Sequence, residues 1–357
     1  MNRPFPPFLS RSAFWATSVL WLLGGCMKYG PIEEERFDTA GGRGLFVVNE
    51  GNFMYGNASL SFYDPEAKQV ENEIFARANA QKLGDVAQSM VVRGSVGWIV
   101  VNNSGVIFAI DTRTFREKGR ITGFVSPRYI HFLSDDKAYV TQLWDNRICI
   151  VDPRSFRIAG YIECPEMTPE NGSTEQMVQW DRYLFVNCWS GHDRLLVVDT
   201  ETDRVCDRIP VGFQPASIAI DCNDRLWVLT GGDPAAGEPP ALTRIDAATR
   251  QIERRFDLPP GESPSELALN GTRDTLYFIC SDVWRMPVEA DWLPERPFVA
   301  ADGTIYYGLT VDPETSEVYV ADAVDYVQPG VVVRYSPQGE PVDRFRTGIN
   351  PGAFGWR

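Results

Sequence analysis

The feature that most constrains this chain is a short segment that recurs seven times. Each copy starts with an aromatic residue, continues with aliphatic residues and usually ends in a polar one. The copies are FVVN (46–49), WIVV (98–101), YVTQ (139–142), FVNC (185–188), WVLT (227–230), YFIC (277–280) and YVAD (319–322). Their aromatic residues are separated by 52, 41, 46, 42, 50 and 42 positions. Self-similarity at such a spacing indicates a fold built from repeated supersecondary units.

The segments around each copy are also short and apolar, and none longer than a turn has the period of an amphipathic helix. A second apolar segment follows each copy, and in five of them it ends in an aspartate that suits the first position of a type I turn. These aspartates, which we expect to be structural, are Asp64, Asp111, Asp152, Asp199 and Asp246. A repeat of about 40 to 50 residues is the length of a four-stranded propeller blade. The sequence therefore predicts an all-β fold, a seven-bladed β-propeller with four-stranded antiparallel blades, whose sixth copy, VWRMPVEADWLPERP, is distorted.

The two ends of this repeat pattern complement each other. The first copy has no apolar segment before it, whereas the chain ends in INPGAFGWR at residues 349–357. That ending has the turn-then-apolar character of SPRYIHF and QPASIAI, which precede other copies. We therefore expect the C-terminal segment to supply the innermost strand of the first blade, so that no long free strand edge remains. Residues 45–357 would then form one propeller domain.

The N-terminal segment has the character of an export signal. Residues 1–25 carry two arginines ahead of an apolar run, which is typical of a signal peptide and too short for a membrane span. LGGC (23–26) resembles the lipobox of bacterial lipoproteins, which implies a lipid on Cys26, and residues 26–44 are too polar to fold alone, so we expect a flexible tether. The acidic run EEE (33–35) resembles the export signal of surface lipoproteins, and a solvated linker explains it equally well. The signal-peptide pattern and the resemblances of the lipobox and the acidic run together predict a lipid-anchored protein of the outer membrane that faces the cell exterior.

The charge and the cysteine pattern exclude several function classes. The formal net charge is −14, and removal of the two signal-peptide arginines leaves 32 basic against 48 acidic residues, or about −16. Nucleic acid is not an expected partner, because its phosphates are neutralised by Lys and Arg. The six cysteines after Cys26 lack the spacing of a metal site, and the sequence leaves their pairing open. Two histidines in the whole chain give poor support to histidine-rich metal sites or haem.

Two motifs resemble those of a known family. YVTQLWDNRICIVDPRSFRIAGYI, residues 139–162, resembles a YVTN-type propeller repeat, and the pattern covers nearly all of the chain after Gly44. NEGN (49–52), together with the lipobox, resembles the first blade of a family of seven-bladed surface lipoproteins of Gram-negative gut anaerobes. Characterised members of that family capture cobalamin for an outer-membrane transporter. The resemblance implies a protein that needs no cofactor, takes cobalamin or another corrinoid as its transported ligand, and passes it to an outer-membrane transporter.

Two sets of loops are expected on one face of such a propeller: those after the second strand of each blade and those between consecutive blades. Loops on a rigid scaffold are where binding residues are expected. The candidate ligand-binding residues in these loops are Glu50, Asn52, Phe53, Tyr55, Asn102, Asn103, Gln142, Trp144, Asn146, Trp189, Trp284 and Tyr326. Aromatic rings can stack on a flat apolar ligand, and amide side chains both donate and accept hydrogen bonds. Such a face suits a corrinoid, while packing between adjacent blades accounts for a single loop aromatic equally well.

Other function classes remain open at this point. Loop carboxylates such as Glu50, Asp145 and Asp193 could hold Ca²⁺ in a lactonase-like hydrolase, but they lack a characteristic spacing and acid is in excess throughout. Ser190 and His192 could form a nucleophile and base, but no GxSxG elbow or acid partner accompanies them. We therefore assign no catalytic residue and no metal ligand, and we predict that the protein is not an enzyme. A propeller that binds protein or glycan is the third alternative.

Overall fold

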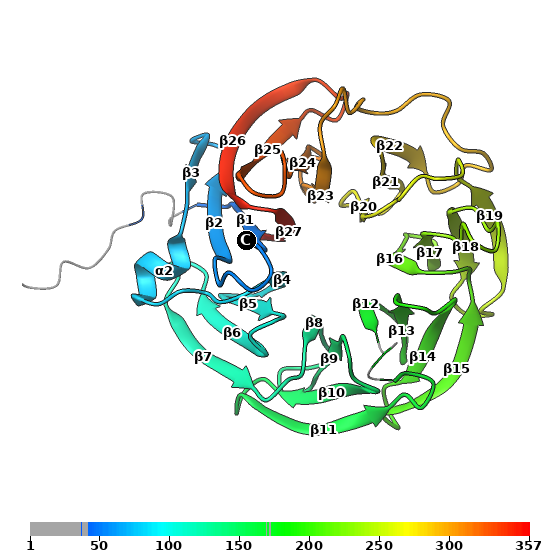
Figure 1. Cartoon of the computed structure of the whole chain (residues 1–357), viewed down its shortest axis with the longest axis horizontal. Helices are drawn as coiled ribbons and strands as arrows, with labels where there is room; N and C mark the ends of the chain where they lie inside the picture. The colour runs from blue at the N-terminus through cyan, green and yellow to red at the C-terminus, as the bar shows by residue number, and fades with distance from the viewer. Residues whose placement is uncertain (1–36, 38–41, 169, 171–172) are drawn as a thin grey trace, which may run out of the picture. The chain divides into compact units, whose positions relative to one another are not determined.

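Seven antiparallel β-sheets stand as blades around a central channel in the computed structural model (Figure 1). The structure describes residues 37, 42–168, 170 and 173–357. The predicted signal peptide, the lipid on Cys26 and most of the tether fall outside these residues and stay predictions. Among the described residues, no helix has the length and apolar character needed to cross a membrane. The seven-bladed all-β fold predicted from the repeat is confirmed.

The blades are numbered in chain order, and their strands are given from the channel outward. The first blade contains β27 (Pro351–Trp356), β1 (Leu45–Asn49), β2 (Ser59–Asp64) and β3 (Gln69–Glu71). A short helix, α2 (Ile74–Asn79), leads to the second blade, which contains β4 (Ala87–Arg93), β5 (Val96–Val101), β6 (Val106–Asp111) and β7 (Glu117–Thr122). The third contains β8 (Pro127–Phe132), β9 (Ala138–Gln142), β10 (Arg147–Asp152) and β11 (Arg157–Glu163).

The remaining blades follow the same plan. The fourth contains β12 (Thr174–Trp180), β13 (Tyr183–Cys188), β14 (Arg194–Asp199) and β15 (Arg204–Pro210). The fifth contains β16 (Pro215–Ile220), β17 (Arg225–Thr230), β18 (Ala241–Asp246) and β19 (Ile252–Asp257). The sixth contains β20 (Leu267–Leu269), β21 (Thr275–Cys280) and β22 (Asp282–Pro287). The seventh contains β23 (Tyr306–Val311), β24 (Val318–Asp322), β25 (Pro329–Tyr335) and β26 (Pro341–Ile349).

The ring is closed by the two ends of the propeller sequence. Strand β27 pairs antiparallel with β1, so that Phe46 lies opposite Gly355 and Val47 opposite Phe354. The backbone N–H of Arg357 adds a hydrogen bond of 2.9 Å to the carbonyl oxygen of the residue just before β1. The prediction that the C-terminal segment completes the first blade is therefore confirmed, and the inner edge of β1 is covered.

The sixth blade departs from the four-stranded plan. It has three strands, and an isolated bridge between Val283 and Val299 stands where the fourth would lie. The segment that leaves β22 carries Pro294 and Pro297, which have no backbone N–H to donate to a strand ladder. The predicted distortion of this blade is confirmed, and the expectation of four strands is corrected for this blade alone.

The turn aspartates hold the backbone as expected. The Asp64 carboxylate accepts hydrogen bonds of 2.9 Å from the backbone N–H groups of Glu66 and Ala67. Asp111, Asp152, Asp199 and Asp246 accept equivalent bonds from residues two or three positions further on. These carboxylates replace backbone partners in tight turns, so they are structural rather than functional.

The hydrophobic core lies between neighbouring blades. Trp98 of the second blade contacts Phe132 and Phe156 of the third, with ring centroids 5.3 and 5.8 Å apart. Trp227 of the fifth blade is fully buried in a cluster that includes Phe278 of the sixth. Because each blade packs on the next in this way, the loops at its ends are held on a rigid ring.

Candidate ligand-binding site

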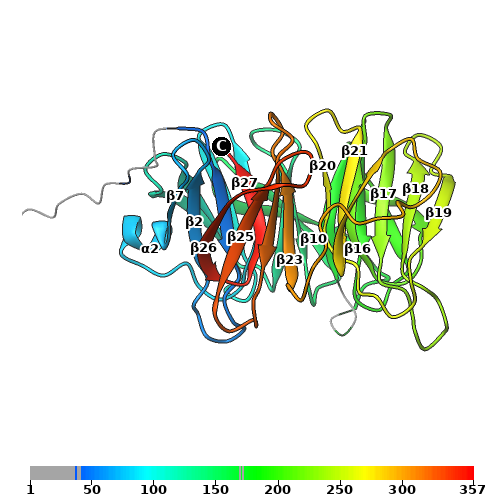
Figure 2. The same cartoon turned by 90° about the horizontal axis from the view of Figure 1, so that it is seen from above.

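A cavity of about 760 Å³ extends from one face of the ring into the central channel. This face, called the loop face, carries the loops after the second strand of each blade and the loops between blades. It is the lower side in Figure 2. Its loops contribute Glu50, Trp144, Trp189 and several neighbouring residues to the cavity wall, and the innermost strands contribute most of the rest. Cavities of about 300 to 1,000 Å³ are typical of small-molecule sites.

A β-bulge at the start of most innermost strands aims one residue at this cavity. In the second blade, Ala87 pairs with Val101 and Ser89 with Val100, so Gln88 has no ladder partner. The innermost strands of five other blades show the same kind of register shift. In the sixth blade, Glu266 takes the equivalent place just before β20. Bulges re-aim side chains and are frequent beside functional sites.

The residues at these seven positions form what we call the bulge ring. Its members, in blade order from the first, are Gly352, Gln88, Arg128, Glu175, Ala216, Glu266 and Tyr307, and all seven line the cavity. Candidate selection by loop position missed the whole ring. A signal was nevertheless present, because Arg128, Ala216 and Gly352 each follow a proline at the start of an innermost strand.

One side of the bulge ring is internally paired. The Nε atom of Arg128 donates to both carboxylate oxygens of Glu175 at 2.9 Å, and its Nη1 atom donates to the Gln88 side chain. The Ser173 hydroxyl donates to the Glu175 carboxylate at 2.8 Å. Burial lowers the pKa of Arg128, and the charge of Glu175 with its other acidic neighbours outweighs that effect, so the pKa is raised overall. The Arg128 guanidinium therefore stays charged in the channel wall.

Glu50, a predicted site residue, is fixed in the first blade beside the seventh. The Tyr307 hydroxyl donates a hydrogen bond of 2.8 Å to the Glu50 carboxylate. A side chain at Gly352 would lie 2.5 Å from that carboxylate, so the glycine leaves the space that Glu50 occupies. Burial raises the pKa of Glu50, and the bond from Tyr307 and the charge of Arg128 oppose this rise.

Glu266 is the most perturbed acid of the cavity. Burial is the main cause that raises its pKa to about 8, and the negative charges of Glu50 and Glu175 add to the effect. Its neighbour in the ring, Ala216, has no polar side chain. A carboxyl group in this state can be neutral near pH 7.

The two predicted tryptophans stand at the mouth of the cavity. Trp144 is 46% exposed and Trp189 is 38% exposed, although both are large apolar side chains. Trp144 has a φ of 61°, a left-handed conformation that is uncommon for a bulky residue. Strained loop residues of this kind cluster at binding sites. Both rings are placed where a flat ligand could stack on them.

A second group of predicted residues lies on the loop face beside the cavity. Phe53 and Tyr55 are 64% and 76% exposed. The Asn52 amide donates a 2.6 Å hydrogen bond to the carbonyl oxygen of Tyr326, which ties the loops of the first and seventh blades together. The Tyr326 ring lies edge-on to that of Tyr307, with centroids 5.8 Å apart. These residues can therefore extend the wall of the cavity outward.

Three of the four predicted amides of the second and third blades have structural partners. Asn102 is buried and donates to the Ser126 hydroxyl at 2.8 Å. Gln142 is buried, accepts a 2.9 Å bond from the Val125 N–H and donates to Asp145 at 3.0 Å. The Asn103 amide donates to Asp85 at 2.6 Å, and Asn146 is half-buried. None of the four predicted amides lines the cavity.

Trp284 does not lie in a loop, as the sequence pattern predicted, but within strand β22. Its ring stacks on Phe278 at 6.5 Å, and its indole N–H donates a 3.0 Å bond to the carbonyl oxygen of Cys280. It lines a separate cavity of about 210 Å³ at the sixth blade. The prediction missed this because β22 begins two residues before Trp284, without an intervening loop.

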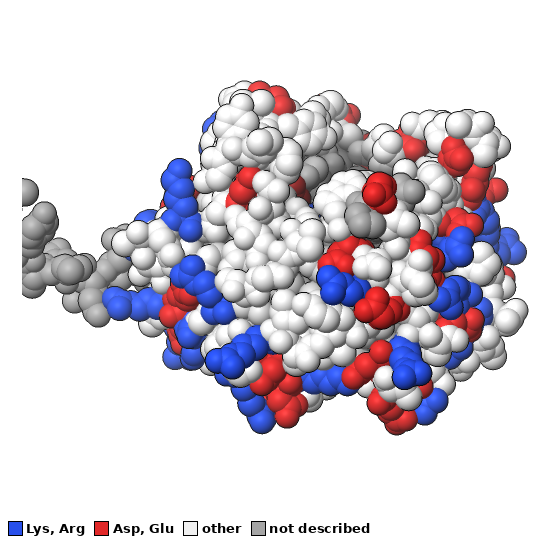
Figure 3. Space-filling model, turned by 60° about the horizontal axis from the view of Figure 1, so that its bottom comes forward, with Lys and Arg blue, Asp and Glu red and all other residues white. Residues whose placement is uncertain are grey.

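Exposed apolar side chains gather on the loop face. Of the twelve large exposed apolar side chains in the described part of the chain, nine are in loop-face loops. They are Phe53, Met54, Tyr55, Val125, Trp144, Trp189, Val324, Tyr326 and Val327. Figure 3, where the loop face is turned upward, shows uncharged residues over much of the middle, with charged residues along the lower edge and on both sides. Exposed apolar side chains that gather on one face of a protein favour a binding role for that face.

Metal and disulfide chemistry have no visible site in the described structure. The described residues contain no group of three or more His, Cys, Asp or Glu side chains that could hold a metal ion. The six cysteines after Cys26 are free thiols.

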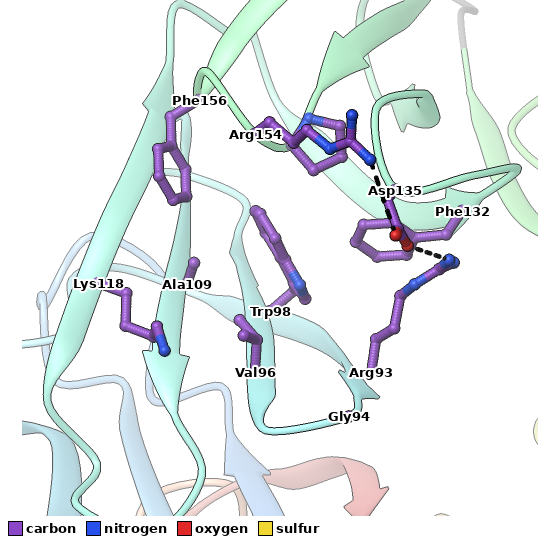
Figure 4. Close-up of a pocket in the computed structure, with 11 residues that line it drawn as sticks. Arg93, Gly94, Val96, Trp98, Ala109, Lys118, Phe132, Asp135, Arg154 and Phe156 are labelled. Carbon is purple, nitrogen blue, oxygen red and sulfur yellow. Dashed lines mark hydrogen bonds and ion pairs between the residues drawn. The ribbon is translucent and has the colours of Figure 1, made fainter.

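A groove of about 470 Å³ lies on the opposite face, between the second and third blades (Figure 4). Trp98, Phe132 and Phe156 form its apolar floor, and Arg93 pairs with Asp135 at 2.7 Å across it. The cationic group of Arg93 also lies 5.3 Å from the centroid of the Phe132 ring. Its polar groups are thus bonded to one another, and no predicted site residue lies there.

Fold and cavity together define a seven-bladed β-propeller with a central channel that opens at the loop face. Residues 43–346 match the family described as Domain of unknown function (DUF5074), and the chain belongs to that family. No curated protein matches the sequence.

Several solved structures share the fold. A quinonprotein alcohol dehydrogenase-like protein of Bacteroides thetaiotaomicron has a TM-score of 0.68 and 15% identity, over 88% of this chain and 79% of that one. A periplasmic gluconolactonase of Pseudomonas aeruginosa has a TM-score of 0.67 and 13% identity, over 88% of this chain and 99% of that one. Hydrazine synthase of Kuenenia stuttgartiensis has a TM-score of 0.59 and 14% identity, over 75% of this chain and 88% of that one. At these identities the likeness concerns the fold and not the activity.

Proposed function

We propose that this protein is a non-enzymatic, lipid-anchored protein of the outer membrane that captures cobalamin or another corrinoid on its loop face and passes it to an outer-membrane transporter. The observation that carries the proposal is the gathering of nine exposed apolar side chains on the same face as a cavity lined with hydrogen-bonding groups. The lipobox at Cys26 supports the anchor, and the resemblance of NEGN (49–52) supports the ligand and the transporter.

The chemistry of the site fits a large flat ligand with amide substituents. Trp144 and Trp189 offer exposed rings for stacking on the corrin plane, while Gln88 and Tyr307 can bond amide groups below. A cavity of about 760 Å³ would enclose part of a corrinoid, and the exposed loop of Phe53 would cover more of it. Because the loops sit on a rigid ring, little ordering is needed on binding.

Calorimetric titration of the purified protein with cyanocobalamin and with cobinamide tests this proposal. We expect one corrinoid per chain, and clearly weaker binding in the double variant Trp144→Ala/Trp189→Ala. Trp292→Ala is the matched control, because Trp292 is 74% exposed but lies in the connection after β22 and does not line the cavity. Absence of binding at about 100 µM ligand would contradict the proposal. A dissociation constant of that size corresponds to a binding free energy of roughly −5.5 kcal/mol. Turnover of a lactone in the presence of Ca²⁺ would instead favour the hydrolase alternative.

A further inference from the structure

The bulge ring is asymmetric in a way that corrinoid capture does not explain. On one side, Arg128 is paired with Glu175 and bonded to Gln88, and Glu50 accepts a hydrogen bond from Tyr307. In that half of the ring every charged side chain therefore has a partner, and the groups left for a ligand are neutral ones such as the Gln88 amide. The fifth and sixth blades present a different surface to the same cavity.

That surface combines a small residue with an uncompensated acid. Ala216 lines the cavity between Glu175 of the fourth blade and Glu266 of the sixth, and we call the part of the cavity beside its short side chain the gap. Glu266 is half-buried in the cavity wall. Within the described structure, no hydrogen bond or ion pair reaches its carboxylate, whereas those of Glu50 and Glu175 both have partners.

Hydrogen bonds between neighbouring innermost strands hold the gap in shape. The Ser217 hydroxyl donates a 2.7 Å bond to the Gln176 side chain and accepts a 3.1 Å bond from the Leu267 N–H. The Ile218 N–H donates to the same Gln176 oxygen at 3.1 Å. These bonds link the innermost strands of the fourth, fifth and sixth blades next to Ala216. The shape of the gap is therefore fixed before a ligand binds.

The charges of the cavity favour a cation. Three carboxyl groups, those of Glu50, Glu175 and Glu266, share the cavity with a single guanidinium, that of Arg128. An anion would have to compete with Glu175 for Arg128, whose Nε atom already donates to that carboxylate. The carboxylates do not converge into a group that could hold a metal ion, in the part of the chain that the structure describes. A cationic nitrogen that carries its own hydrogen-bond donors suits the gap better.

We propose that the bulge ring is a binding site for a primary ammonium group, which enters the gap at Ala216 and pairs with Glu266. The chemical class of ligand is a small aliphatic amine, or an aminoalkyl substituent of a larger molecule seated in the cavity. An ammonium group has three donors and no acceptor, so it can satisfy a carboxylate and neighbouring oxygens together. This site does not depend on the corrinoid proposal, because a free amine is sufficient to occupy it.

Binding of an amine at this site is coupled to release of a proton from Glu266. Burial holds the pKa of Glu266 at about 8, so the group is mostly protonated at pH 7, and pairing with an ammonium requires its ionised form. The titratable groups that face Glu266 are Glu50, Glu175, Tyr129 and Tyr307. Amine binding should therefore release close to one proton at pH 7 and should tighten as the pH rises from 6 to 8.

The test is a calorimetric titration with 1,4-diaminobutane at pH 7 in two buffers of different ionisation enthalpy, which reports proton release. The neutral analogue 1,4-butanediol serves as the ligand control. We expect Glu266→Gln to weaken diamine binding by at least about tenfold and to abolish the proton release. Glu295→Gln, an exposed glutamate of the sixth-blade connection, should bind as the wild type does.

A second variant separates loss of the site from loss of the fold. Ala216→Leu fills the gap and keeps Glu266, so it should also weaken diamine binding by at least about tenfold. Wild-type affinity in either variant, or equal binding of 1,4-butanediol and the diamine, would overturn the proposal. Absence of diamine binding to the wild type at about 10 mM would also overturn it, without bearing on corrinoid capture.

Discussion

Replacement of Glu266 by glutamine should make the stability of this protein much less dependent on pH. Burial, reinforced by Glu50 and Glu175, raises the pKa of Glu266 to about 8, whereas its ordinary value is 4.5. The native state therefore binds more protons than the unfolded chain between these values, and stability falls as the pH rises. At about 1.36 kcal/mol per pKa unit, the full shift lowers the free energy of unfolding by roughly 4 kcal/mol between pH 5 and pH 9. Because Glu266 faces a cavity that water can enter, its desolvation is smaller, and we expect the free energy of unfolding to fall by about 2 to 4 kcal/mol over this pH range.

The assay is urea unfolding at pH 5, 7 and 9, followed by tryptophan fluorescence. Glu266→Gln should unfold close to the wild type at pH 5 and should exceed its free energy of unfolding by about 2 to 4 kcal/mol at pH 9. Glu295→Gln should follow the wild type at all three pH values, since Glu295 is exposed. An equal difference between Glu266→Gln and the wild type at pH 5 and pH 9 would refute the reasoning that burial keeps Glu266 neutral.

Three further predictions follow from the ring and the loop face. Each single variant, Trp144→Ala or Trp189→Ala, should lower affinity for cyanocobalamin in calorimetry by about 5- to 30-fold, the loss of one stacked ring, with little change in melting temperature. Arg128→Met should lower the free energy of unfolding at pH 7 by about 3 kcal/mol, because it leaves Glu175 buried without its cation, and the double variant Arg128→Met/Glu175→Gln should recover part of this loss in urea unfolding. Removal of residues 351–357 takes β27 from the first blade, and size-exclusion chromatography with urea unfolding should then show an expanded or associating protein without one cooperative transition.

The sequence alone was sufficient to predict most of the fold. Seven copies of one strand pattern leave few architectures possible, and the missing strand before Leu45 pointed to a partner at the C-terminus. The sixth blade lacks a fourth strand in the segment that carries Pro294 and Pro297, residues that cannot donate a backbone hydrogen bond. What the pattern could not give was strand register, which depends on pairing between segments far apart in the chain.

The same limit explains which site residues were predicted. Glu50, Trp144 and Trp189 were found because loop position alone places them near the channel mouth. Asn102 and Gln142 have the same polarity as binding amides, but their side chains are buried and bond to the backbone, Asn102 at the carbonyl oxygen of Pro127 and Gln142 at the N–H of Val125. The bulge ring was missed because the shift that turns one residue of each innermost strand into the channel becomes visible only when the strands are paired.

The most direct test of the proposed function is the position of cobalt in a crystal of this protein grown with cyanocobalamin, located by anomalous scattering. We predict one cobalt over the loop face, with the corrin plane within stacking distance of Trp144 and Trp189. Cobalt in the groove beside Trp98 on the opposite face, or no ordered cobalt at saturating ligand, would contradict corrinoid capture by the loop face.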